Sequence, residues 1–295
     1  MITTKMIIII TVCVLILILL YLFMITPRIW HRAQKSYHMG VFYAHRGLHD
    51  NKGSAPENSM KAFRMAVEEG FGIELDVQLS KDGIPVIFHD FTLERMCCVT
   101  EKVENMTYEQ LQELTLLNTD EKIPTLKEFL QMVDGKVPLI VELKIEWTNL
   151  ALCPVVDKML SEYKGIYCIE SFNPLALLWY RKNHAKVMRG QLSTNFRRDG
   201  GYRNVFYFLL THLLTNCITR PDFIAYNCNF KRESGRRICR SLYKNLSVAW
   251  TVKSQNQLES LENDFDLFIF DSFIPENTKK GFKINKKNGA YYQNV

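Results

Sequence analysis

The residues best suited to chemistry are acids that alternate with aliphatic side chains in short apolar runs. In "IELDVQLSKDG" (73–83), Glu74 and Asp76 stand two residues apart, so both side chains lie on one face of a strand. In "VPLIVELK" (137–144), Glu142 follows a similar run. Carboxylates alone form the oxygen-only ligand set that hard cations prefer. The pattern therefore predicts one divalent cation, Ca²⁺ or Mg²⁺, held by Glu74, Asp76 and Glu142.

Two histidines and two cationic residues stand at the ends of the same kind of run. His45 and Arg46 close "VFYAHRG", His89 closes "PVIFHD", and Lys144 follows Glu142 by two residues. The imidazoles of His45 and His89 can take and give a proton near neutral pH. Arg46 and Lys144 supply positive charge for a phosphate. Each residue alone has an ordinary structural interpretation, but together with a dication they favour phosphoryl transfer.

These residues need a scaffold that brings strand ends together. Apolar strands alternate with helix-prone stretches, which predicts an α/β fold with a parallel sheet. Nine strands are expected, near residues 41–45, 73–79, 85–90, 137–144, 166–172, 186–192, 222–227, 246–252 and 267–272. A (β/α)8 barrel has eight places, so we expect a distorted TIM barrel in which the Asp-Gly turn at 82–83 adds an antiparallel strand. In such a barrel the polar strand faces point into the lumen, and the catalytic end is the C-terminal end.

The N-terminus carries an uncharged apolar run, residues 6–25, which is long enough to cross a bilayer as a helix. A cleaved signal peptide is the alternative, but "TPRIW" follows instead of small residues. We expect a single-pass membrane anchor and basic linker (1–38), then one catalytic domain (39–295). Basic residues after the run, such as Arg28, Arg32 and Lys35, favour a cytoplasmic domain, as do eight cysteines without a disulfide pattern.

Charge and the two inserts say less about function. The net charge of +6 is spread along the chain, which suits a protein beside anionic lipid and gives no reason to expect nucleic acid binding. The charged insert 91–123 has no readable chemistry. Within the insert 195–218, residues 205–218 show one narrow polar strip (Thr211, His212, Thr215 and Asn216) at helical spacing. This segment is interpreted either as a barrel helix or as a helix that dips into the bilayer.

The motifs "HRG" (45–47), "PENS" (56–59), "ELDVQLSKDG" (74–83), "HD" (89–90), "VELK" (141–144), "SFNP" (171–174) and "WTV" (250–252) together resemble the glycerophosphodiester phosphodiesterases. The resemblance covers most of the chain after the apolar run. It implies a distorted TIM barrel that hydrolyses glycerophosphodiesters to sn-glycerol 3-phosphate and an alcohol, with a bound divalent cation. It also implies attack by the neighbouring glycerol hydroxyl and a cyclic phosphate that water then opens, with His45 and His89 as the acid–base pair. Within this pair we expect His45 to be the base and His89 the acid in the first step.

Three further positions carry two interpretations each. Glu57 and Asn58 precede a helix, where Asn is a good cap, but they could instead support the metal ligands. Trp250 either fills the lumen or, by the resemblance, lines the glycerol pocket. Lys253 and the segment "FDSFIPE" depart from the family's usual residues, which leaves the alcohol specificity open.

Two other functions stay open beside the glycerophosphodiesterase. One is a lysophospholipase D-type activity on membrane lysolipids, suggested by the anchor and the apolar insert. The other is a non-catalytic phosphodiester-binding module, which the completeness of the catalytic set disfavours. The sequence does not indicate an oligomeric state.

Overall fold

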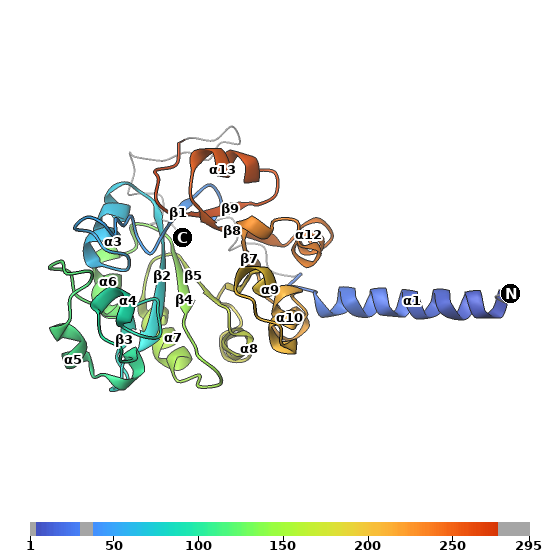
Figure 1. Ribbon diagram of the computed structural model, residues 1–295, viewed down its shortest axis with the longest axis horizontal. Coiled ribbons are helices and arrows are strands. Elements are labelled where there is room, and N and C mark those ends of the chain that lie inside the picture. Colours follow the sequence, from blue (N-terminus) through green and yellow to red (C-terminus); the bar gives the residue numbers. More distant parts are fainter. Residues whose placement is uncertain (1–3, 30–37, 277–295) are drawn as a thin grey trace.

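Eight parallel strands close into a barrel in the computed structural model, which describes residues 4–29 and 38–276. The strands are β1 (Phe42–His45), β2 (Gly72–Leu79), β4 (Leu139–Leu143), β5 (Tyr167–Ser171), β6 (Arg189–Ser193), β7 (Phe223–Asn227), β8 (Leu246–Val252) and β9 (Leu267–Phe270). Around the ring they follow the order β1, β9, β8, β7, β6, β5, β4 and β2, and β2 pairs back with β1. The predicted TIM barrel is confirmed (Figure 1).

The ninth strand is the predicted addition to the barrel. β3 (Pro85–Ile87) pairs antiparallel with the end of β2, with Pro85 opposite Leu79. The Gly83 amide donates to the Ser80 carbonyl at 2.9 Å, and Gly83 has a φ of +78°. Glycine adopts this left-handed conformation without a steric penalty. The "SKDG" sequence therefore forms the hairpin that the strand count requires.

Helices cover the outside of the barrel. The longer ones are α3 (Met60–Glu68), α6 (Leu126–Val133), α7 (Leu152–Glu162), α8 (Pro174–Asn183), α12 (Ser234–Ser241) and α13 (Gln255–Leu261). Their apolar faces pack on the outward side chains of the strands, as Phe63 of α3 and Phe129 of α6 do in one cluster with Ile73 and Leu75 of β2. Burying each such phenyl ring contributes roughly 2–3 kcal/mol.

Alternation along the strands divides the lumen into an apolar part and a polar part. Tyr43 and Ile140 belong to an apolar cluster inside the barrel. Two residues further along the same strands stand His45 and Glu142, on the same faces. The polar side chains therefore gather at the C-terminal ends of the strands, as the barrel fold predicts.

The insert 91–123 forms a small lobe beside the barrel mouth. It contains α4 (Glu94–Cys97), the 3-10 helix η1 (Val103–Asn105) and α5 (Tyr108–Glu113). Met96, Val103 and Leu111 form a separate apolar cluster with Phe88, which lies beside His89 in the chain. The lobe is therefore packed directly against the segment that carries a predicted catalytic histidine.

The expectation of one continuous helix over 205–218 is wrong. α10 (Val205–Thr211) ends before Leu213, whose φ is +59°, and a separate helix α11 (Asn216–Thr219) follows. The expected polar strip is partly buried. The Thr211 hydroxyl accepts a hydrogen bond from the amide of Phe196, the first residue of α9 (Phe196–Asp199). Asn216 is also buried and donates its side-chain N–H to the Ile25 carbonyl. These bonds hold the segment to the protein.

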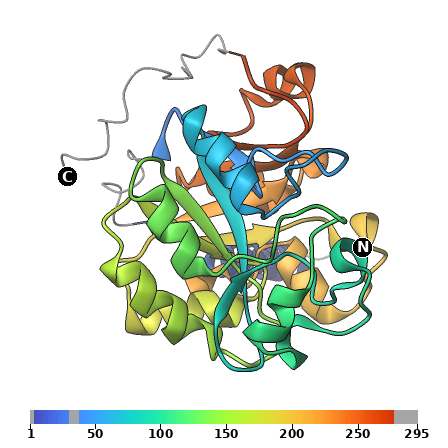
Figure 2. The ribbon, with the colours of Figure 1, turned by 90° about the vertical axis from the view of Figure 1, so that its left-hand side faces the viewer.

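Before the barrel, α1 (Thr4–Met24) projects as a separate rod with no buried side chain (Figure 1). Among the described residues, this helix is long and apolar enough to cross a membrane. In Figure 2, α3 lies toward the viewer and α1 lies behind the barrel, so the two are on opposite sides. Arg32 and Lys35 of the predicted linker, and residues 277–295 of the predicted domain, lie outside the described residues.

Candidate active site

The three predicted metal ligands converge inside the barrel. One oxygen from each of Glu74, Asp76 and Glu142 lies within 4.8 Å of the others, and all three side chains are buried. The sheet register produces this arrangement, because Asp76 of β2 stands directly opposite Glu142 of β4. The strand alternation predicted from sequence is thus the feature that builds the cluster.

The electrostatics of the cluster match a cation-binding site. Burial and the neighbouring Asp76 raise the pKa of Glu74 well above its usual value. Burial alone would also raise the pKa of Asp76, but the positive charges of His89, Lys144 and Arg46 lower it. The Oδ1 atom of Asp76 is buried and has no hydrogen-bond partner. A bound cation would satisfy that oxygen and relieve the repulsion between the acids.

Two cationic side chains border the acids. The Nζ atom of Lys144 lies 3.0 Å from Glu142 and 3.6 Å from Asp76. The guanidinium of Arg46 lies 3.3 Å from Asp76 through Nε and 2.6 Å from Glu57 through Nη1. The predicted phosphate-binding residues therefore lie against the predicted metal ligands, so one phosphate could contact both.

His45 stands between the acid cluster and an acid that the sequence prediction missed. Its Nε2 atom is 4.0 Å from Glu74, and its Nδ1 atom is 3.7 Å from Asp271, just beyond the end of β9. Asp271 also lies 3.2 Å from Nε2 of His49. Burial lowers the pKa of His45 to about 4, and the charge of Arg46 adds to the effect. His45 is therefore neutral near pH 7 and able to accept a proton.

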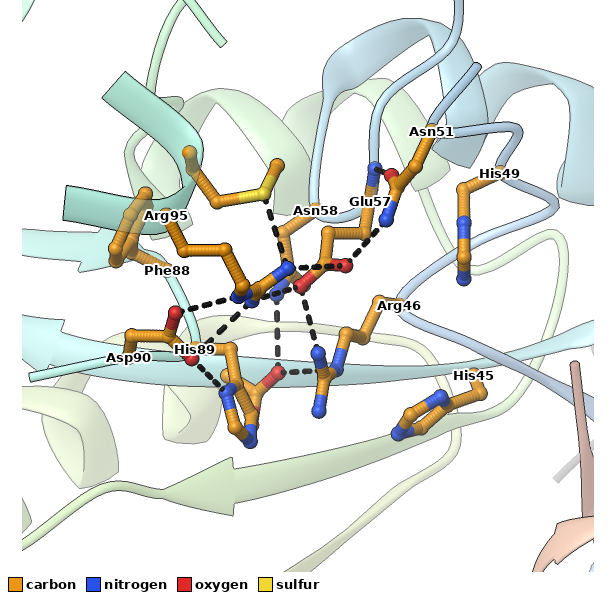
Figure 3. Close-up of polar contacts among 12 residues, drawn as sticks. His45, Arg46, His49, Asn51, Glu57, Asn58, Phe88, His89, Asp90 and Arg95 are labelled. Carbon is orange, nitrogen blue, oxygen red and sulfur yellow. Dashed lines mark hydrogen bonds and ion pairs between the residues drawn. The ribbon is translucent and has the colours of Figure 1, made fainter. Parts of the chain in front are cut away.

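His89, the second predicted catalytic histidine, has its own carboxylate partner (Figure 3). Its Nδ1 atom lies 2.5 Å from Asp90, which in turn accepts a hydrogen bond from Arg95 at 2.7 Å. Arg95 belongs to α4 of the insert, so the lobe helps to hold His89. The Nε2 atom of His89 takes no part in this contact with Asp90.

Glu57 joins the insert to the barrel mouth. Arg95 donates to it at 2.7 and 3.0 Å, Arg46 at 2.6 Å, and the Asn51 amide at 2.6 Å (Figure 3). Burial alone would raise the pKa of Glu57, but these donors, Arg95 foremost, lower it to about 2. Glu57 thus stays ionised and fixes Arg46, whose guanidinium faces Asp76.

The expectation that Asn58 caps the helix is wrong. Ser59 occupies the cap position of α3, where its hydroxyl accepts from the Ala62 amide. Asn58 has a φ of +57°, and its side chain donates to the Oδ2 atom of Asp76 at 2.9 Å. This bond orients a candidate metal ligand, which fits the alternative interpretation of Asn58 as a support for the metal ligands.

Trp250 lies at the lumen wall, packed edge-on against Phe172 with ring centroids 5.5 Å apart. Its Nε1 atom is buried without a hydrogen-bond partner. A cavity of about 760 Å³ opens at the mouth, and Lys52, Lys253 and Asp271 are among the residues that line it, as are His45 and Arg46. The role of Trp250 in a glycerol pocket stays a prediction.

Four residues near the site were missed by sequence reasoning. Asp90 and Asp271 each follow a strand end, so the rule that selected His45 could also have found them. Glu170 stands opposite Glu142 in register and is fully buried, with Oε2 unpaired. Arg95 carries no signal in the sequence, because it reaches the site from a lobe without strand periodicity.

Comparisons with known proteins identify similar sequences. The model of the glycerophosphoryl diester phosphodiesterase family matches residues 45–272. YhdW of Bacillus subtilis (strain 168) is 30% identical over 216 residues, which cover 65% of this chain and 88% of that protein. Human glycerophosphodiester phosphodiesterase 1 is 44% identical over 95 residues, which cover 29% of this chain and 28% of that protein.

The fold is also similar to that of solved structures. A phosphodiesterase from Oleispira antarctica, solved in complex with the product sn-glycerol-3-phosphate, aligns with a TM-score of 0.65 at 24% identity. The alignment covers 80% of this chain and 94% of that one. At this identity the likeness supports the barrel fold alone.

Proposed function

Because the chain belongs to the glycerophosphoryl diester phosphodiesterase family, we propose that it hydrolyses glycerophosphodiesters to sn-glycerol 3-phosphate and an alcohol. The observation that carries the proposal is the buried convergence of Glu74, Asp76 and Glu142. Both predicted phosphate-binding cations and His45 lie against this cluster. The Oleispira phosphodiesterase, solved with sn-glycerol-3-phosphate bound, has a similar barrel fold.

The acid cluster fits a divalent cation by its chemistry. All three donors are carboxylates, and one buried oxygen of Asp76 lacks a hydrogen bond. Glu74, Asp76 and Glu142 would hold the ion, with Asn58 orienting Asp76. When bound, the ion supplies positive charge that offsets the charge developing on the phosphate oxygens. Ca²⁺ and Mg²⁺ both accept this oxygen-only set.

Arg46 and Lys144 hold the substrate phosphate in this proposal. Glu57 and Asp76 fix the guanidinium of Arg46, and Glu142 fixes the ammonium of Lys144. Both groups retain N–H donors beyond these contacts, since a guanidinium has five and an ammonium has three. Cations that are already oriented need little reorganisation to stabilise charge on the reacting phosphate.

The two histidines move the protons in two stages. His45 is neutral, so its Nε2 takes the proton from the glycerol hydroxyl that attacks phosphorus. His89 gives its proton to the leaving alcohol oxygen as the phosphorus–oxygen bond breaks, which leaves a cyclic phosphate. A water molecule then opens the ring, with the histidines exchanging roles, and returns both to their starting states. Asp271 and Asp90 orient the two imidazoles.

We also propose that α1 anchors the enzyme in a membrane. Its 21 residues, at about 1.5 Å per residue, match a hydrocarbon core of about 30 Å. The side of the membrane on which the barrel lies stays a prediction, with the basic residues after α1 favouring the cytoplasm.

The test uses the full-length protein stripped of metal by a chelator. Glycerophosphocholine hydrolysis should vanish on stripping and return when Ca²⁺ or Mg²⁺ is added, since the acid cluster needs an ion. His45→Ala and His89→Ala should lose at least about 100-fold in kcat. Both variants should still bind Tb³⁺, a luminescent stand-in for Ca²⁺, because neither residue is a ligand. Activity that is indifferent to the chelator would refute the cation role.

A further inference from the structure

The chain segment that follows α1 is built into the barrel. Ile25 is fully buried, and its carbonyl accepts hydrogen bonds from the Asn216 side chain at 3.1 Å and the Cys239 thiol at 3.3 Å. The Thr26 carbonyl accepts from the guanidinium of Arg220 at 3.2 Å. The Arg28 amide donates to the Pro221 carbonyl at 2.9 Å. Backbone atoms on the two sides of this junction are therefore fixed relative to each other.

A cavity of about 460 Å³ opens at this junction and is rich in arginine. It is lined by Pro27, Arg28, Ile29, Arg181, Ala185, Arg189 and Arg220. Together these residues form the arginine cavity. Four arginines line a space large enough for a phosphate and part of a glycerol.

Arg189 is the member with an unmet hydrogen-bond requirement. Its side chain is 2% exposed; Nε and Nη2 donate to the carbonyls of Thr219 and Arg220 at 3.0 and 2.8 Å. Its Nη1 is buried without a hydrogen-bond partner, and the Asp222 carboxylate stands 3.9 Å from it. A buried N–H that lacks a partner is costly, so Arg189 is the member of the cavity lining whose hydrogen bonds are incomplete.

Positive charge in the cavity exceeds negative charge. Asp222 is the carboxylate that pairs with both Arg28, at 3.5 Å, and Arg189. Arg181 donates instead to the carbonyls of Cys217 and Ile218, which carry no charge. Burial, partly offset by Asp222, lowers the pKa of Arg189 to about 10, and the charges of Arg28 and Arg181 add to the lowering. An anion would neutralise this excess.

The cavity lies where α1 would leave a bilayer. The guanidinium of Arg220 stacks over the ring of Phe23, in the last turn of α1, at 5.7 Å. Pro27 and Ile29 follow within five residues of the helix end and give the cavity an apolar side. If α1 spans about 30 Å of hydrocarbon, these residues stand at the depth of the lipid phosphates. An apolar side beside arginines suits the glycerol and phosphate of a lipid.

We propose that the arginine cavity binds the phosphate of an anionic phospholipid from the membrane that holds α1. Guanidinium groups bind phosphate oxygens through paired N–H donors, and Arg28, Arg181 and Arg189 line one space. The site rests on the proposed anchor and is independent of the catalytic chemistry. It would fix the barrel against the membrane surface through one bound lipid.

Titration calorimetry on full-length protein in uncharged detergent tests the site. The probes are dihexanoylphosphatidic acid, which is a monoester and not a substrate, dihexanoylphosphatidylcholine and inorganic phosphate. Phosphatidic acid should bind at least about 10-fold more tightly than the other two, because only it combines a net negative charge with an acylated glycerol. Equal affinity for phosphatidylcholine would overturn the proposal, and equal affinity for inorganic phosphate would reassign the cavity to free phosphate.

Variants separate this site from other basic surface. Arg28→Gln and Arg181→Gln should each weaken phosphatidic acid binding at least about 10-fold, whereas Lys182→Gln, next to Arg181 but outside the cavity lining, should not. All three variants should hydrolyse glycerophosphocholine at the normal rate. Unchanged lipid binding in both arginine variants would refute the cavity. If the unmodified protein does not hydrolyse glycerophosphocholine, that result would instead refute the proposed function.

Discussion

At the scale of single residues, the site contains two kinds of side chain. The candidate metal ligands are positioned by the alternation of side chains along the strands, whereas the partners of the histidines are positioned by tertiary packing. Glu74, Asp76 and Glu142 are set by two strands in register, and the sequence is enough to bring them together. The partner of His45 comes from the opposite side of the β1 strand, through the β1–β9 pairing. Asp271 therefore belongs to the candidate site together with the residues predicted from the sequence.

We predict that Asp271→Asn lowers kcat about 10-fold to 100-fold while KM changes little, because the amide no longer stabilises the protonated form of His45. The pH–rate profile should shift as well, since the carboxylate favours the charged imidazole. Steady-state kinetics on glycerophosphocholine across pH would show this. Ser272→Ala, which removes a hydroxyl that donates to Asp271 at 2.8 Å, is the matched control and should have a smaller effect.

Sequence alone reaches the residues whose side chains follow the strand period, and it fails where position depends on a loop. Asn58 looks like a helix cap by type, yet its left-handed backbone turns it toward Asp76 and leaves Ser59 as the cap. Arg95 reaches Glu57 from a lobe whose fold depends on its own apolar cluster. Neither placement has a periodic signal.

At the scale of elements, all nine strands lie close to where the apolar runs predicted them. Strands are short and bounded by turns, so their hydrophobic runs are distinct. The segment 205–218 differs from its prediction because helical spacing continues through Leu213, and only the left-handed backbone of that residue breaks the helix. Exposed Val205, Phe206 and Phe208 explain why the segment looked like a membrane helix.

The entry to β1 contains a buried histidine with consequences for acid stability. His38 is 1% exposed, and its Nδ1 atom lies 2.5 Å from the Tyr43 hydroxyl. Burial lowers the pKa of His38 from 6.5 to about 4. The folded protein therefore binds this proton less readily than the unfolded chain. The resulting stability is complete above about pH 6.5 and is lost as the pH falls toward 4.

We predict that His38→Gln reduces the loss of unfolding free energy between about pH 8 and about pH 5 by about 2 kcal/mol. Urea unfolding of both proteins at each pH measures this difference. Tyr43→Phe keeps the buried imidazole, so it should keep the pH dependence of the unmodified protein even if its stability at pH 8 is lower. Identical pH dependence in His38→Gln would contradict the assignment.

At the scale of the whole molecule, the proposed anchor α1 and the candidate active site lie diagonally across the barrel. The residues that hold the anchor, Ala185, Pro221 and Asp222, precede β6 and β7 and so lie at the N-terminal ends of these strands. The site lies at the C-terminal ends of β1, β2 and β4. In the ring order β6 is opposite β1, and β7 is opposite β2 (Figures 1 and 2).

This arrangement predicts whether the substrate is dissolved in water or held in the membrane. A strand of five residues is about 16 Å long, so if α1 spans the bilayer as proposed, the mouth would stand clear of the lipid phosphates. A lysolipid would have to leave the bilayer to reach it, and withdrawing only four methylenes costs about 3 kcal/mol. We therefore predict kcat/KM at least about 100-fold higher for glycerophosphocholine than for palmitoyl lysophosphatidylcholine in the same proteoliposomes.

A lysophosphatidylcholine with a butyryl chain is the control for this comparison, because it is soluble in water and carries the same headgroup. It should be hydrolysed much faster than the palmitoyl form. A preference for the palmitoyl substrate would show that the mouth contacts the bilayer, and the family activity would then act on membrane lysolipids.

The burial of Ile25 has a consequence for any shortened form of the protein. Ile25 fills part of the apolar core between the barrel and its helices, and two barrel side chains donate hydrogen bonds to its carbonyl. A protease that cut after the apolar helix would leave this residue as a frayed chain end, or remove it and open a hole in the packing. A soluble enzyme released by cleavage at this point would therefore have a lower free energy of unfolding. A stable soluble form would have to begin upstream, within the last turn of the helix.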